Sequence, residues 1–313
     1  MIFILVFFFV IIAIIMIKKR KKRKFRLKDE RVPTNLGFRI EGGKQLSKCL
    51  RSSLPSTFVN NLKRRLLENE PSWKNHDFDW RFFELKRYFV LNSLLKTVPM
   101  FSEKVDEVWH EMLMFTKDYE KFSNKFYQEF LHHTPNMDST PIPGERAFFD
   151  WVYLSLFQST VNSRLLWKGF LKYPIKKEIL GDFKNLSEKE LLVKYFRQTE
   201  DCYDVKKYLI QKMKTEIVQS ETIEYKNQPT SFNKLTSENE YHTLLPAFVF
   251  FSIYEADLFQ QNMNSLFPAY TGKSDKGGGS SSCSGYGCSS SSDNDSGGSS
   301  SCSSSSSCGG GCS

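Results

Sequence analysis

The fold class is decided by residues 102–126, which read SEKVDEVWHEMLMFTKDYEKFSNKF. Apolar side chains recur there every three or four positions, at Val105, Val108, Trp109, Met112, Phe115, Tyr119, Phe122 and Phe126. This spacing places a broad apolar stripe along one side of a helix, which is typical of a helix that faces a protein core. Ser102 is a favoured N-cap residue, and Glu103 would lie in the first turn. We therefore predict one helix from Ser102 through Phe126.

The neighbouring sequence repeats this helical pattern. We predict that Asp79 caps a helix whose apolar residues run from Trp80 to Leu95. Ser187 and Glu190 have the spacing of a capping box. The apolar residues 244–254 are too few to cross a bilayer and predict a buried helix. Alternating strands with hairpin turns are not found, so we predict an all-α globular domain over residues 29–276.

The N-terminus has the sequence of a membrane anchor. Residues 2–17 are uninterrupted apolar residues, and a helix of this length spans roughly 24 Å of the ~30 Å hydrocarbon core. Basic residues do not precede this run, and small residues of a cleavage site do not follow it, so we predict an uncleaved anchor and not a signal peptide. Basic residues follow at Lys18, Lys19, Arg20, Lys21, Lys22, Arg23, Lys24, Arg26 and Lys28.

These basic residues also predict the topology, because basic flanks of a membrane span stay in the cytoplasm. We expect a single-pass protein of the cell membrane, with residues 1–28 as anchor and basic cluster, the N-terminus outside and the domain in the cytoplasm. The bilayer would hold residues 2–17, and anionic lipids are a candidate partner of residues 18–28. Topology alone also explains the cluster. When the nine basic residues of this cluster are left out, the net charge of +9 falls to zero. We therefore expect no nucleic-acid-binding surface.

The C-terminus differs sharply from the domain. Residues 277–313 consist almost entirely of Ser, Gly and Cys, and we predict that they are disordered, because they cannot bury enough apolar area to offset the entropy cost of folding. The five cysteines there lack the paired CxxC spacing of a zinc site. Three interpretations remain: a flexible solubilising tail, a site for a soft metal such as zinc or copper, and a segment for covalent modification or tethering.

One group of residues has the composition of a functional site. Asp106 and His110 are four residues apart and share a helix face, and His132 and His133 follow further along the chain. Asp106, His110, His132 and His133 are therefore candidate metal ligands. Asp106 and His110 could equally form an acid–base pair or a purely structural hydrogen bond. We assign no catalytic residue and no cofactor.

The segment DEVWHEMLMFTKDYEKF, together with the following FLHHTPN, resembles the glycine-rich domain-containing protein-like family. The family pattern is Asp-x-x-Trp-His-x-His, then Thr or Ser, then Tyr. The matching residues are Asp106, Trp109, His110, Thr116 and Tyr119, whereas Met112 stands where the second family histidine falls. The anchor and the Ser/Gly/Cys-rich tail resemble a group of uncharacterised bacterial membrane proteins. The resemblance implies a helical domain in a bacterial membrane setting, without an established activity.

The sequence lacks the motifs of several common enzyme classes. We find no phosphate-binding loop, nucleophile elbow, dinucleotide fingerprint or zinc finger. We therefore expect a membrane-anchored cytosolic helical domain that binds a protein partner, as an interaction or scaffold module. The alternative is a membrane-tethered metal-dependent enzyme that uses Asp106, His110, His132 and His133.

Overall fold

The computed structural model describes residues 26–133, 143–199, 202–222, 232–237 and 239–267. Within these ranges the secondary structure is helical, apart from two isolated β-bridges between Phe38 and Phe157 and between Leu95 and Phe196. The prediction of an all-α domain is therefore confirmed for the described part of the chain. The predicted anchor at residues 2–17 and the tail at 277–313 lie outside it.

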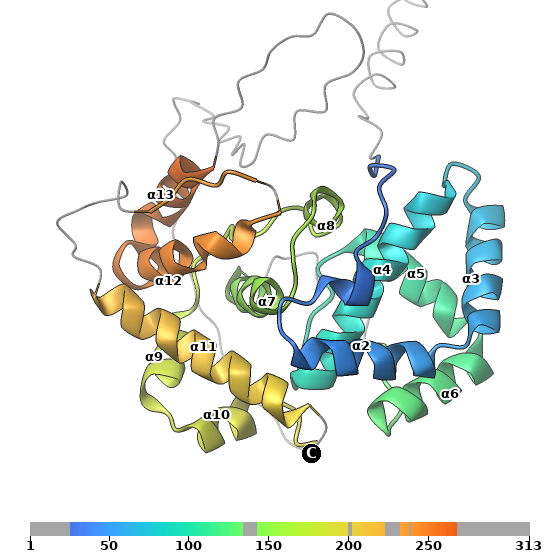
Figure 1. The fold of residues 1–313 in the computed structure, drawn as a ribbon, viewed down its shortest axis with the longest axis horizontal. Helices are drawn as coiled ribbons and strands as arrows, with labels where there is room; N and C mark the ends of the chain where they lie inside the picture. The colour runs from blue at the N-terminus through green and yellow to red at the C-terminus, as the bar shows by residue number, and fades with distance from the viewer. Residues whose placement is uncertain (1–25, 134–142, 200–201, 223–231, 238, 268–313) are drawn as a thin grey trace, which may run out of the picture.

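The helices form two groups that lie on either side of α7 (Figure 1). One group contains η1 (Thr34–Gly37), α2 (Gly42–Ser53), α3 (Ser56–Asn69), α4 (Asn75–Leu94), α5 (Glu103–Leu113) and α6 (Thr116–Tyr127). The centre holds α7 (Pro143–Leu156) and α8 (Val161–Leu166). The other group contains α9 (Lys177–Asn185), α10 (Glu188–Tyr195), α11 (Tyr203–Thr222), η4 (Tyr241–Leu244), α12 (Leu245–Tyr254), η5 (Ala256–Leu258) and α13 (Phe259–Leu266).

A fully buried carboxylate joins α4 to the central helices. Glu84 accepts hydrogen bonds from Tyr153 Oη at 2.6 Å, Trp167 Nε1 at 2.8 Å and Ser163 Oγ at 2.7 Å, and it pairs with Arg87 Nη1 at 3.1 Å. A buried charge is tolerated only when it is paired and hydrogen-bonded, and Glu84 meets both conditions. This network fixes α4, which is the helix against which α5 packs.

The structure corrects the prediction of one helix over residues 102–126. Ser102 is the N-cap as predicted, and its Oγ accepts a hydrogen bond from the Val105 amide at 3.2 Å. The helix, however, ends at Leu113, and a new helix, α6, begins at Thr116. Phe115 leaves the helical conformation (φ −95°, ψ 60°) and packs its ring 5.8 Å from that of Phe58 on α3. The break in the helix therefore coincides with a contact between Phe115 and the neighbouring helix α3.

The other helix predictions have mixed outcomes. The capping box of Ser187 and Glu190 is present at the start of α10. Residues 245–254 form the buried helix α12, as predicted. Asp79 does not cap α4, which begins at Asn75, and instead pairs with Lys63 Nζ at 2.8 Å. Across the described ranges, none of the helices has the length and apolar character needed to cross a membrane.

Candidate metal centre

The centre of the candidate site is the carboxylate of Asp106. Asp106 and His110 lie one turn apart on α5, and His110 Nδ1 is 3.5 Å from Asp106 Oδ2. This is the proximity that the four-residue spacing predicts. A second imidazole approaches the other carboxylate oxygen, because His133 Nε2 is 2.8 Å from Asp106 Oδ1. Asp106 therefore lies between two histidines from different parts of the chain.

The two histidine rings also lie next to each other. Their centroids are 4.5 Å apart, and one ligand atom from each of Asp106, His110 and His133 lies within 4.8 Å of the others. The sequence alone placed His110 with Asp106, but the tertiary structure selects His133 as the third member. His132, the neighbouring candidate, is exposed and packs against the ring of Phe130 at 4.9 Å. The predicted ligand set of four is thus reduced to three.

A hydrogen-bond chain brings His133 back to α5. Trp109 Nε1 donates to Tyr119 Oη at 3.1 Å, and Tyr119 Oη donates to the carbonyl of Leu131 at 2.7 Å. Ser123 on α6 adds two bonds to the same returning segment, by accepting from the Leu131 amide and donating to the Glu129 carbonyl. Burial raises the pKa of Tyr119 to about 12, so its hydroxyl remains a donor at neutral pH.

The site has one closed side and one open side. Trp109 packs edge-on against His133, with ring centroids 4.3 Å apart. The side chain of His133 is 6% exposed and that of Asp106 is 19% exposed, whereas that of His110 is 55% exposed. The indole thus excludes solvent behind His133, and a ligand or water molecule can reach the cluster from the side of His110.

Two of the distances in the cluster can be compared with those that a metal needs. Ligand atoms about 2.0–2.1 Å from a tetrahedral zinc ion are about 3.3 Å apart. The 3.5 Å between His110 and Asp106 fits this value, whereas the 2.8 Å between His133 and Asp106 is a hydrogen-bond length. His133 would have to move by about 0.5 Å to bind the ion together with Asp106. In the structure as described, Asp106 instead holds both imidazoles as hydrogen-bond or ion-pair partners.

Four of the five residues that carry the resemblance lie in or next to this cluster. Asp106 and His110 are in it, Trp109 forms its wall, and Tyr119 holds the segment that carries His133. Thr116 is exposed at the start of α6 and lies outside this hydrogen-bond chain. Met112, which stands where the second family histidine falls, is fully buried.

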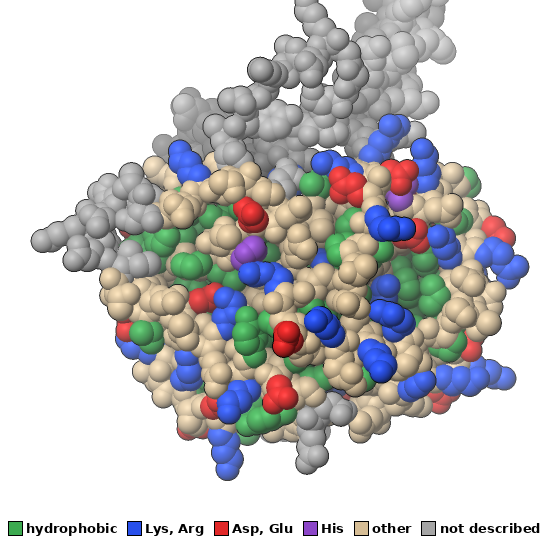
Figure 2. All heavy atoms as spheres, viewed as in Figure 1, with side chains coloured by type: hydrophobic (Ala, Val, Ile, Leu, Met, Phe, Trp, Pro, Cys, Tyr) green, Lys and Arg blue, Asp and Glu red, His purple; other side chains and the backbone are tan. Residues whose placement is uncertain are grey.

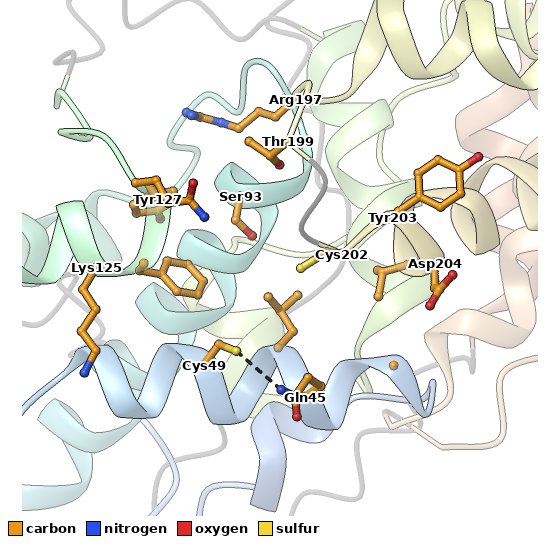
Figure 3. A pocket seen from close by; sticks show the side chains of 15 residues that line it. Gln45, Cys49, Ser93, Lys125, Tyr127, Arg197, Thr199, Cys202, Tyr203 and Asp204 are labelled. Carbon is orange, nitrogen blue, oxygen red and sulfur yellow. Dashed lines mark hydrogen bonds between the residues drawn. The ribbon is translucent and has the colours of Figure 1, made fainter.

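A separate cavity is lined by two cysteine side chains that are not joined in a disulfide. This cavity of about 450 Å³ lies between α2, the end of α6 and the start of α11, and Cys49 and Cys202 both line it (Figure 3). Cys49 Sγ accepts a long hydrogen bond from Gln45 Nε2 at 4.0 Å. The sequence gave no reason to pair these two cysteines, because they lie more than 150 residues apart and neither belongs to a motif.

Sequence reasoning also missed several charged groups that the fold buries. Glu84 and Arg87 lie fully buried within the aromatic-rich helix α4, and Lys86 on the same helix is partly buried. Charged residues interleaved with a run of aromatic and aliphatic residues are a usable signal, because a charge that enters the core needs a partner there. His242 offers no comparable signal in the sequence.

The comparisons with known proteins give one match. Residues 47–141 match the model of a family described as UCP032817-like. The matched range contains Asp106, His110 and His133, together with α3, α5 and α6. The comparisons with curated proteins and with solved structures gave no match.

Proposed function

We propose that this chain is a membrane-anchored helical protein that binds a divalent transition-metal ion through Asp106, His110 and His133. The observation that carries this proposal is the convergence of one ligand atom from each residue within 4.8 Å. Two imidazoles and one carboxylate form a ligand set that suits zinc. The hydrogen-bond chain from Trp109 to Leu131 supports the proposal, because it holds the distant ligand in place.

The exposure of His110 favours a site with an open coordination position. Three protein ligands leave room for one water molecule on a tetrahedral ion, as in catalytic zinc sites. A bound zinc ion would lower the pKa of that water and supply a nucleophile. Asp106 and His133 would orient the ion, and Trp109 would exclude solvent from one side. A metal-dependent reaction at the membrane surface is thus the activity that this geometry supports best.

The proposed setting rests on the sequence. Residues 2–17 would anchor the protein in the cell membrane, residues 18–28 would lie at anionic lipid headgroups, and the domain would face the cytoplasm. Residues 277–313 would form a flexible tail. The resemblance to the glycine-rich domain-containing protein-like family and to bacterial membrane proteins supports this setting. The scaffold interpretation, with an unidentified protein partner, stays a prediction.

Metal analysis of the purified full chain tests the proposal. We expect stoichiometric zinc in the wild-type protein and its loss in Asp106→Asn and in His133→Asn. His132→Asn is the matched control, because His132 is adjacent in sequence but lies outside the cluster. Circular dichroism of each variant checks that the fold is retained. A folded wild-type protein that stays metal-free after incubation with zinc would contradict the proposal.

A further inference from the structure

A groove of about 690 Å³ runs between α2, α3, α4 and the segment that leads into α2. Apolar side chains line part of it, including Leu54 and Phe82, and three basic residues also line it: Arg31, Arg51 and Lys86. Aspartate and glutamate are absent from its lining. In Figure 2, hydrophobic side chains with Lys and Arg around them are visible over α2, α3 and α4. The groove therefore has a positive charge that its own walls do not neutralise.

Lys86 is the most unusual of these basic residues. Its ammonium group forms no hydrogen bond or ion pair with any residue in the described ranges, and it lies 5.0 Å from the centre of the Phe82 ring. Lys63 nearby differs, because its ammonium group pairs with Asp79 at 2.8 Å. Burial, reinforced by repulsion from Arg51, lowers the pKa of Lys86 to about 8. Asp79, which lies outside the lining, opposes this shift. Arg51 and Lys86 thus share a groove whose lining contains no carboxylate.

The side chain of Asn35 holds Arg51 at the groove. Arg51 Nη2 donates to Asn35 Oδ1 at 3.3 Å. Asn35 and Leu36 both adopt left-handed conformations, with φ of 48° and 57°, and Leu36 is a residue type that rarely does so. The carbonyl of Leu36 accepts a 2.8 Å hydrogen bond from the buried Arg87, and this bond stabilises the turn from its core side. Fixed donors reduce the entropy cost of binding a ligand.

Polar groups on α3 add further donors. Ser56, the first residue of α3, lines the groove, and the N-cap residue Pro55 provides no side-chain cap. The exposed Ser56 can therefore offer its hydroxyl, at the N-terminus of α3, to a ligand in the groove. Together with Arg51 and Lys86, this hydroxyl forms a set of donors without a matching acceptor in the groove.

We propose that this groove binds a phosphate-bearing ligand, with Arg51 and Lys86 as its charged contacts and Ser56 as a hydroxyl donor. The guanidinium group matches two phosphate oxygens, and the ammonium group supplies a point charge. The apolar lining would receive the part of the ligand that carries the phosphate. Two sources have this chemistry: a soluble phosphate compound and a phospholipid headgroup. The proposal is independent of the metal centre, which lies on α5 and the segment after α6.

The first experiment uses inorganic phosphate and the purified full chain. We expect phosphate to raise the melting temperature, whereas chloride at equal ionic strength does not. Arg51→Gln and Lys86→Met should each weaken the apparent affinity by at least about tenfold, because each removes a charge-assisted hydrogen bond. Arg64→Gln is the matched control, since Arg64 is an exposed arginine on α3 that does not line the groove. If Lys86→Met fails to fold, the exposed Arg51→Gln still tests the groove.

The second experiment identifies the source. The full chain and its variants are reconstituted in nanodiscs of phosphatidylcholine, with or without phosphatidic acid, and their melting temperatures are compared. Stabilisation by phosphatidic acid that is lost in Arg51→Gln but kept in Arg64→Gln assigns a lipid headgroup to the groove. Stabilisation by inorganic phosphate alone assigns a soluble ligand. The proposal is wrong if neither probe stabilises the protein, or if the groove variants respond as the wild type does.

Discussion

Trp109 Nε1 donates a 3.1 Å hydrogen bond to the hydroxyl of Tyr119, and the same hydroxyl donates to the carbonyl of Leu131. Trp109 precedes His110 on α5, and Leu131 lies two residues before His133. The single hydroxyl thus connects the two parts of the chain that supply the candidate ligands. It can do so because the chain bends at Phe115 and directs α6 back along α5.

Removal of this hydroxyl should affect both stability and metal binding. Tyr119→Phe loses two hydrogen bonds, so we expect the free energy of unfolding to fall by about 1–2 kcal/mol. The zinc affinity should fall about tenfold, because His133 loses its anchor. Tyr127→Phe is the control, since it removes another buried hydroxyl, bonded to the Phe89 carbonyl at 2.9 Å. Equal zinc affinities in the two variants would show that Tyr119 does not position the site.

Trp109 should be a major contributor to stability. It is 3% exposed and packs against Tyr88 at 5.4 Å and Phe89 at 5.6 Å, which confirms its predicted place in the core. Trp109→Ala should lower the free energy of unfolding by about 3–5 kcal/mol in urea titrations, because it leaves a large cavity. Trp73→Ala should cost less, since Trp73 is only partly buried. A cost for Trp109→Ala no larger than that for Trp73→Ala would contradict this account.

Two ion pairs with the same spacing should contribute differently to the free energy of unfolding, because one is buried and the other is not. Glu84 and Arg87 are fully buried, whereas the side chains of Lys104 and Glu107 are 39% and 38% exposed, and both pairs are three residues apart. Glu84→Gln should lower the free energy of unfolding by about 3–5 kcal/mol, because it leaves the Arg87 charge buried without its partner. Glu107→Gln should cost at most about 1 kcal/mol. Chemical denaturation of both variants makes the comparison, and similar losses would rule out the burial argument.

His242 should make stability depend on pH. Burial, with repulsion from Arg39, lowers the pKa of His242 to about 4, and the buried Nδ1 atom has no partner in the described ranges. The unfolded chain, in which histidine has a pKa of about 6.5, therefore binds the proton first. The stabilising contribution is complete above pH 6.5 and is lost as the pH falls toward 4.

Unfolding experiments from pH 4.5 to 7.5 should detect this effect. We expect the free energy of unfolding of His242→Gln to change less over this range than that of the wild type. Glu240 and Lys212 also act on His242, and both remain in the variant, so the difference between the two curves isolates the imidazole. Parallel curves would mean that His242 is protonated equally in the folded and unfolded states.

The sequence by itself determined the helical class and the local parts of the site. Apolar residues at helical spacing predicted an all-α domain, and the Ser102 and Ser187 caps were identified at the correct positions. The proximity of Asp106 and His110 was equally predictable. In each case the partners lie within one turn of helix, so helix geometry alone brings them together.

Only the tertiary structure decided which distant residues meet. At the bend, Phe115 meets a ring of α3, and the segment after α6 brings His133, and not His132, to Asp106. The groove around Lys86 likewise requires three helices to pack together. These contacts arise from the burial of apolar surface and the pairing of buried polar groups across the whole chain, and such long-range packing leaves no periodic pattern in the neighbouring sequence.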